Sequence, residues 1–173
     1  MKKQLLHSDW QLTTVGKNDT IPATVPGSVY NDLLNAGRME DPYWRDNEMK
    51  ALALMDEDYR YNTTFDVNAD VLNSERVLLR CEGLDTIADI VLNGEKIASV
   101  CNMHRTWEFD VKDNLKTTGN TLEIVFHSPT KYIKEQDKIC HAGGSGDAMV
   151  GFPNLRKAHC MFGWDWGPRL PDA

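Results

Sequence analysis

Residues 86–100 read Thr-Ile-Ala-Asp-Ile-Val-Leu-Asn-Gly-Glu-Lys-Ile-Ala-Ser-Val, with Asn93-Gly94 between two apolar runs. A two-residue type I′ turn requires positive φ at both central residues, and Asn followed by Gly adopts that conformation at low steric cost. We therefore predict a β-hairpin, with strands over residues 86–92 and 96–100.

Short strands are also indicated on both sides of this hairpin. Residues 59–65, 107–111 and 122–126 alternate apolar or aromatic side chains with polar ones, which is typical of strands with one buried face. Residues 77–81 form a short apolar run, which predicts a strand buried on both faces. Short strands at this close spacing predict an all-β fold, a β-sandwich.

One or two short helices are expected beside the strands. Ser28 can cap a segment with Val29, Leu33 and Leu34 on one face, and Gly37 suits its end. Pro129 opens a polar stretch, residues 130–139, that we interpret as a second helix or an irregular turn.

Length and charge limit the classes of function. The chain has 173 residues, which suits one domain over residues 1–173, and its formal net charge is −7. An acidic surface repels phosphate backbones, so we expect no nucleic-acid partner. We expect no membrane span, because no apolar run is long enough, and no export signal is visible. The compartment stays open: periplasmic or extracellular if a signal was removed, otherwise cytoplasmic.

The four cysteines form no CxxC pair and no evident disulfide framework, so we expect buried free thiols. Cys140-His141 and His159-Cys160 hold zinc-ligating residue types. Adjacent residues of a strand point to opposite faces, however, and the spacing is unlike that of zinc fingers. We therefore expect no metal and no cofactor.

Trp164-Asp165-Trp166, flanked by Gly163, Gly167 and Pro168, is the strongest candidate site. Glycine and proline disfavour a central strand, so we expect an exposed, shaped loop. Aromatic rings pack on the apolar faces of sugars, and a carboxylate accepts hydrogen bonds from their hydroxyls. The alternative is that both tryptophans are core or interface anchors and Asp165 is a turn residue.

Four other features contain residue types found in catalytic or ligand-binding sites, but we interpret each of them as structural. We interpret Arg156-Lys157 as a solvated basic turn; the alternative is that the Arg156 guanidinium orients the Asp165 carboxylate. His104 is expected to form structural hydrogen bonds. Gly143–Gly146 lacks the Lys-Ser/Thr of a phosphate loop and reads as a flexible loop. Asn47-Glu48 resembles the Asn-Glu pair that carries the acid/base glutamate in retaining glycosidases. Such an enzyme needs a second carboxyl group nearby, and no sequence feature indicates which acidic residue that would be, so we interpret the match as a coincidence of composition.

These motifs together resemble the β-mannosidases of glycoside hydrolase family 2, in the right order over nearly the whole chain. The pieces shared with the wider family are Gly83-Leu84-Asp85-Thr86 and Leu92-Asn93-Gly94. The piece specific to the mannosidases is Phe162–Pro168. Further matching pieces are Val25–Tyr30, Asp41–Arg45 with Asn47-Glu48, Asn102–Arg105 and Arg156-Lys157.

The resemblance implies a jelly-roll sandwich similar to galactose-binding domains, followed in the complete enzyme by an immunoglobulin-like domain and a TIM barrel. The two catalytic glutamates belong to that barrel, so we expect no catalytic residue in this chain and no activity of the chain alone. The implied reaction is retaining hydrolysis of terminal β-D-mannose from β-mannosides or manno-oligosaccharides. Asp165 would hold hydroxyls of the reacting sugar, with Trp164 and Trp166 as walls.

Other interpretations remain open at this point. The same jelly roll is used by stand-alone carbohydrate-binding modules and by structural domains without a ligand. A sister β-galactosidase or β-glucuronidase shares the less specific motifs.

Overall fold

The computed structural model describes residues 2–143, 146–165 and 167–173. Its strands form two antiparallel sheets, one of six strands in the order β2-β1-β3-β8-β5-β6 and one of two, β4-β7. The strands are β1 Trp10–Thr14, β2 Thr20–Ala23, β3 Tyr59–Phe65, β4 Leu78–Glu82, β5 Ile87–Leu92, β6 Glu95–Cys101, β7 Thr106–Asp110 and β8 Asn120–Phe126.

The predicted hairpin is confirmed. Strands β5 and β6 pair from Ile87↔Cys101 to Leu92↔Glu95, with a register shift after Ile90. Asn93 has φ 53° and Gly94 has φ 83°, the two positive values that a type I′ turn requires. The turn is further held by the Asn93 side chain, which donates to Asn120 Oδ1 at 2.9 Å.

The alternation in β3 and β8 builds the core. Tyr59, Tyr61 and Thr63 are buried in β3, and Leu122 and Ile124 are buried in the neighbouring strand β8. The small sheet lies across this face, because Val77, Cys81 and Val111 join the same hydrophobic cluster. The all-β sandwich is thus as predicted, with its core between the two sheets.

The expectation that residues 77–81 are buried on both faces is wrong. In β4 the side chains of Leu79 and Cys81 face the core, whereas Leu78 and Arg80 are exposed. The reason is topological: no further layer covers the outer face of the two-stranded sheet in the described part of the chain.

Among the described residues, four α-helices accompany the sheets: α1 Val29–Asn35, α2 Asn47–Leu54, α3 Ala69–Leu72 and α4 Pro129–Ile139. The helix expected after Ser28 is confirmed, because Ser28 caps α1 by accepting from Asn31 N. Of the two interpretations of residues 130–139, the helix is the one found, and Ser128 caps α4 by accepting from Lys131 N. Helices α2 and α3 were not predicted. They are short, and neither has a side-chain hydrogen bond at its N-cap that a sequence motif would signal.

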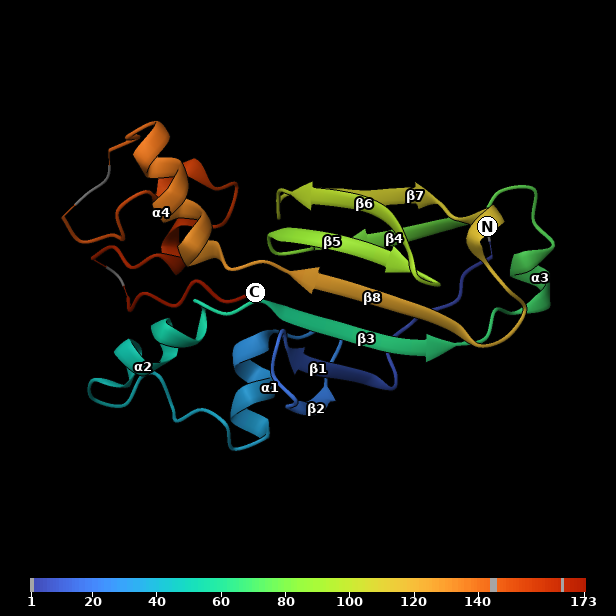
Figure 1. The fold of residues 1–173 in the computed structure, drawn as a ribbon, viewed down its shortest axis with the longest axis horizontal. Helices are drawn as coiled ribbons and strands as arrows, with labels where there is room; N and C mark the ends of the chain where they lie inside the picture. Colours follow the sequence, from blue (N-terminus) through green and yellow to red (C-terminus); the bar gives the residue numbers. More distant parts are fainter. Residues whose placement is uncertain (1, 144–145, 166) are drawn as a thin grey trace.

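The last third of the chain stands apart from the strands. Figure 1 shows α4 and the segments after it, in orange and red, as a lobe at one end of the sandwich. This lobe has its own small hydrophobic cluster of Ile133, Ala148, Phe152, Leu155 and Phe162. Three-residue 3₁₀ turns at Phe152–Asn154 and His159–Met161 replace regular strands there.

Candidate functional site

The segment from Phe162 to Arg169 forms a loop closed at its base. Phe162 pairs with Arg169, and Gly163 pairs with Ala148, each as an isolated antiparallel bridge. Leu170 N donates to the carbonyl of Met161 at 2.9 Å, one step outside the loop. The expected irregular loop is therefore found, and backbone hydrogen bonds fix where it begins and ends. We call residues 163–168 the tip loop.

Trp164 is the inner residue of the tip loop. Its indole meets the ring of Phe152 edge-on, with centroids 5.5 Å apart, and the backbone N–H of Trp164 donates to the carbonyl of Asp147 at 3.0 Å. Trp164 has φ 86°, a left-handed conformation unusual for a bulky residue. The half-buried Trp164 is thus partly an anchor on the lobe's hydrophobic cluster.

Asp165 has the opposite environment. It is exposed, and among the described residues no hydrogen bond or ion pair engages its carboxylate. An exposed carboxylate next to an anchored residue has its backbone held while its oxygens remain accessible to a ligand. Trp166, the third predicted site residue, lies outside the described residues.

The tip loop is tied to α2 by an ion pair that the sequence did not suggest. Glu48 Oε1 accepts from Arg169 Nε at 2.6 Å and from the Arg169 backbone N–H at 3.0 Å. Burial alone would raise the pKa of Glu48, but these hydrogen bonds from Arg169 lower it, so the carboxylate stays ionised. Glu48 thus has a specific structural partner in Arg169, while the interpretation of its match to the acid/base motif as a coincidence of composition stays a prediction.

The expectation that Lys157 lies in a solvated basic turn is wrong, because Lys157 forms a buried ion pair. Its side chain is completely buried, with Nζ 2.6 Å from Asp85 Oδ2 and bonded to the carbonyl of Asp172. Burial lowers the pKa of Lys157, and the Asp85 carboxylate opposes that shift. No local pattern signals this, since Asp85 lies 72 positions earlier. Arg156, by contrast, is exposed as expected, and no described contact joins it to Asp165.

The Asp172 carboxylate extends this polar centre toward α1. It accepts from the backbone N–H groups of Tyr30, at 3.0 Å, and Ala173, at 2.8 Å. Burial nonetheless raises the pKa of Asp172. Lys157 and Asp172 therefore fasten the chain after the tip loop to both the sandwich and α1.

His127 marks the junction between β8 and α4. Its ring nitrogens lie 2.9 Å from Asp58 Oδ2 and 3.2 Å from Asp89 Oδ2. Partial burial disfavours the charged ring, but the two carboxylates outweigh it and raise the pKa of His127. His104, the histidine singled out from the sequence, is exposed in a tight turn, where its backbone N–H donates to Asn102 Oδ1 at 2.9 Å.

The cysteines differ from expectation in burial. Cys81 is buried, and burial raises the pKa of its thiol to about 11. Cys101, Cys140 and Cys160 are exposed free thiols, so the expected burial is wrong for these three. They lie at the end of the edge strand β6, just after α4, and in a 3₁₀ turn. Over the described ranges, no group of three or more His, Cys, Asp or Glu is arranged to hold a metal ion.

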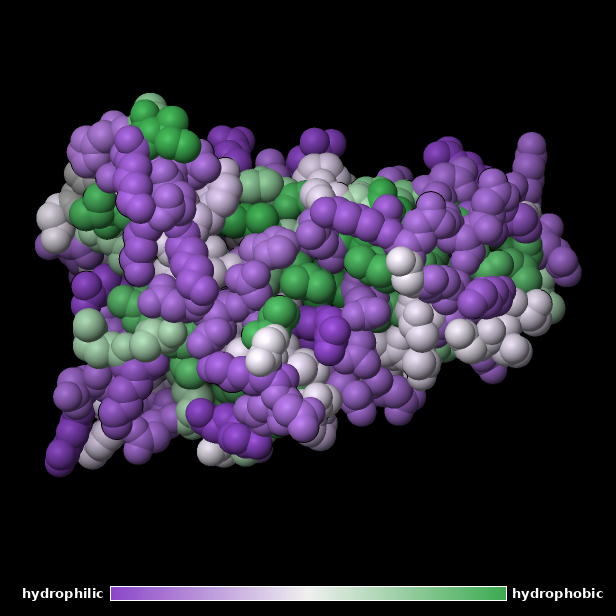
Figure 2. Space-filling model, viewed as in Figure 1, coloured by the Kyte–Doolittle hydropathy of each residue, from purple (hydrophilic) through white to green (hydrophobic). Residues whose placement is uncertain are grey.

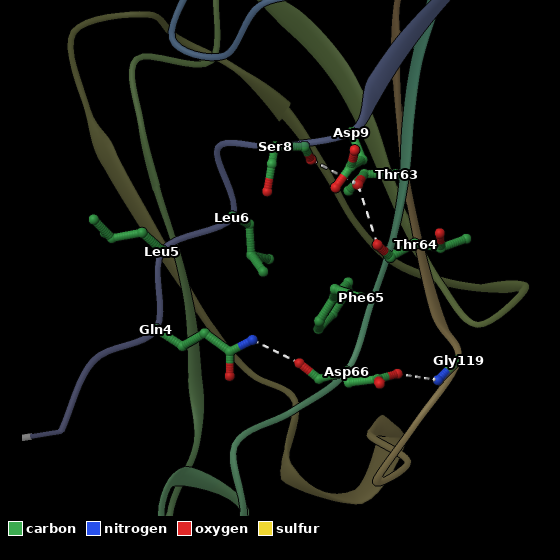
Figure 3. A pocket seen from close by; sticks show the side chains of 10 residues that line it. All are labelled: Gln4, Leu5, Leu6, Ser8, Asp9, Thr63, Thr64, Phe65, Asp66 and Gly119. Atoms are coloured by element: carbon green, nitrogen blue, oxygen red, sulfur yellow. Dashed lines mark hydrogen bonds between the residues drawn. The ribbon is translucent and has the colours of Figure 1, made fainter.

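A surface hollow lies away from the tip loop. It measures about 410 Å³ and is lined by the N-terminal segment, the end of β3 and Gly119 (Figure 3). Its polar groups bond one another: Gln4 Nε2 donates to the carbonyl of Asp66 at 2.6 Å, and Gly119 N donates to Asp66 Oδ1 at 2.8 Å. We interpret it as a seam where the N-terminal segment docks on the sandwich.

The face drawn in Figure 2 is mainly hydrophilic, with local apolar areas. Figure 2 shows hydrophobic atoms gathered at the end of α4 and along the middle of the sandwich. Ile139 in the lobe is 80% exposed, and Tyr43 and Trp44, before α2, are 74% and 63% exposed. No helix among the described residues is long and apolar enough to cross a membrane.

Comparison with known proteins gives a consistent set of relatives. A family model described as glycosyl hydrolase 2 galactose-binding domain-like matches residues 10–173. The chain is 32% identical to a β-mannosidase of Bos taurus, over 96% of this chain and 20% of that protein. It is 36% identical to β-mannosidase A of Emericella nidulans, over 92% of this chain and 17% of that protein.

A solved structure extends the similarity to three dimensions. The crystal structure of a β-D-mannosidase from Dictyoglomus thermophilum matches 97% of this chain and 21% of its own, with TM-score 0.90 at 37% identity. The chain thus spans about a fifth of the length of the relatives it matches.

Proposed function

The chain belongs to the glycosyl hydrolase 2 galactose-binding domain-like family, and from that premise we propose that it is the N-terminal sugar-binding domain of a β-mannosidase. In this proposal residues 1–173 form one domain of a longer chain. The remaining domains supply the catalytic carboxylates, and the substrate is a β-mannoside or manno-oligosaccharide. The chain alone is then inactive.

The observation that carries the proposal is the exposed Asp165 carboxylate on a loop with a fixed base. Trp164 packs on Phe152, and the Phe162–Arg169 bridge closes the loop, which supports a restrained backbone next to Asp165. A protein carboxylate on a restrained backbone binds a ligand more tightly, because the protein loses little conformational freedom on binding.

The chemistry of a terminal sugar fits this arrangement. Asp165 accepts hydrogen bonds from one or two hydroxyls of the reacting mannose, and charge-assisted bonds of this kind are the stronger ones. Trp164 and Trp166 form apolar walls against the sugar's C–H faces. In a retaining glycosidase, two carboxyl groups about 5–5.5 Å apart carry out the bond cleavage, and this domain contributes by orienting the sugar toward them.

The test uses the full-length natural gene product and aryl β-mannoside as substrate. We expect Asp165→Asn to lower kcat/KM about 100-fold, because hydrogen bonds to a charged acceptor that strengthen in the transition state are lost. The matched control is Asp113→Asn, an exposed aspartate in the turn Lys112–Asn114, which should keep full activity. Unchanged activity of Asp165→Asn would refute the role of the tip loop. A wild-type preference for aryl β-galactoside would assign the chain to a sister enzyme.

A further inference from the structure

The ion pair between Glu48 and Arg169 joins two segments 121 residues apart in the sequence. One carboxylate oxygen accepts from both the backbone and the side chain of Arg169. This double contact restrains the position of the Arg169 backbone and the direction of its side chain together. In Figure 1, α2 lies beside the red segment that contains Arg169.

Arg169 in turn shapes the start of the tip loop. It pairs with Phe162 across the loop base, and its side chain crosses over Gly163. A Cβ atom on Gly163 would lie 2.7 Å from Arg169 Cγ and 2.9 Å from the carbonyl oxygen of Asp147. Gly163 therefore fits beneath Arg169 because it has no side chain, and it leads directly into Trp164 and Asp165.

Glu48 is a firm anchor because α2 is fixed to the sandwich. Ala51 and Met55, on and just after this helix, are almost completely buried. The hydroxyl of Tyr30 donates to the carbonyl of Ala51 at 2.8 Å, which links α2 to α1. A displacement of Glu48 would therefore require α2 to leave a packed core.

We propose that Glu48 is a positioning residue that holds the tip loop, and with it Asp165, in the geometry needed to bind the reacting sugar. The inference rests on the proposed function of Asp165. Catalysis is sensitive to such support, because a misplacement of about 1 Å can cost 100-fold in rate. The side chains of Glu48 and Arg169 remain 26% and 40% exposed, so the pair should contribute little to global stability.

The experiment compares variants of the full-length gene product in activity and in amide hydrogen exchange. We expect Glu48→Ala to lower kcat/KM for aryl β-mannoside about 30-fold. It should also speed exchange in peptides containing the Arg169 amide, which loses its acceptor. Glu48→Gln keeps an acceptor oxygen, so a loss of about 3-fold is expected. The control is Glu40→Ala, which removes a nearby exposed pair with Lys50 and should change neither quantity.

A double-mutant cycle with Asp165→Ala separates positioning from a general structural effect. If Glu48 acts through the tip loop, Glu48→Ala should cause little further loss once the Asp165 carboxylate is absent. Fully multiplicative losses, or unchanged exchange at Arg169 in Glu48→Ala, would overturn the inference. If Asp165→Ala itself retains full activity, the proposed function fails, whereas faster exchange at Arg169 would still show that Glu48 restrains the loop.

Discussion

The sandwich and the terminal lobe, residues 129–173, are stabilised in different ways. In the sandwich, continuous hydrogen-bonded ladders such as β3–β8 join strands that alternate buried and exposed side chains. The described part of the lobe has isolated bridges, a five-residue hydrophobic cluster and buried or half-buried ion pairs. The sandwich therefore spreads its stability over many similar contacts, whereas the lobe depends on a few particular residues.

The two regions also differ in their proposed roles: the sandwich is a scaffold, and the lobe carries the proposed binding residues. A regular ladder places side chains on two faces at fixed spacing, which suits a scaffold. A loop closed by specific contacts can present Trp164 and Asp165 in opposite environments, one packed and one exposed. Loops on rigid scaffolds are common locations for binding residues for this reason.

The largest expected effect comes from removing the centre of the lobe's cluster. Phe162 is completely buried, so Phe162→Ala should destabilise by about 3–5 kcal/mol through lost burial and a cavity. The loss should fall mainly on the lobe. Hydrogen exchange should rise across residues 146–170 while strands β3 and β8 stay protected. Equal loss of protection in β8 would mean that the two regions unfold as one unit.

A somewhat smaller effect is expected from Lys157→Met, which should lower the free energy of unfolding, measured with urea, by about 2–4 kcal/mol. The substitution leaves Asp85 without its cation, but Asp85 is 19% exposed, so water compensates in part. The control is Arg80→Met in the sandwich, whose exposed pairs with Glu82 and Glu108 should contribute less than about 1 kcal/mol. Similar losses for both variants would remove the contrast between buried and exposed pairs.

The smallest effect is a pH dependence at the junction of the two regions. The pKa of His127 is raised in the folded chain, so protonation favours the folded state. Its contribution is complete below the unfolded pKa of about 6.5 and is lost as pH rises through the folded pKa. The free energy of unfolding, measured with urea, should therefore decrease more between pH 6 and pH 8 for the wild type than for His127→Gln. Parallel decreases in the two proteins would exclude His127 as the source.

Several parts of the fold were predictable because their signals are local. The Asn93-Gly94 turn, the alternating strands and the cap at Ser28 depend on residues within a few positions of one another. The irregular course of the tip loop was predictable for the same reason, because glycine and proline act on their own backbone. The role of Asp165 stays a prediction.

The missed features depend on residues distant in sequence. Burial of Lys157 and the pairing of Glu48 with Arg169 require partners 72 and 121 positions away, so no window of sequence contains both members. The exposure of Leu78 depends on whether another layer covers the outer face of its sheet.

Local signals in the sequence were enough to predict the all-β class, the hairpin and the helix capped by Ser28, because steric and hydrogen-bonding preferences of neighbouring residues decide them. The tertiary structure alone decided which charges are buried, which face of β4 meets water and what holds the tip loop in place. Burial and pairing are properties of three-dimensional neighbours, and the topology of the two sheets brings those neighbours together.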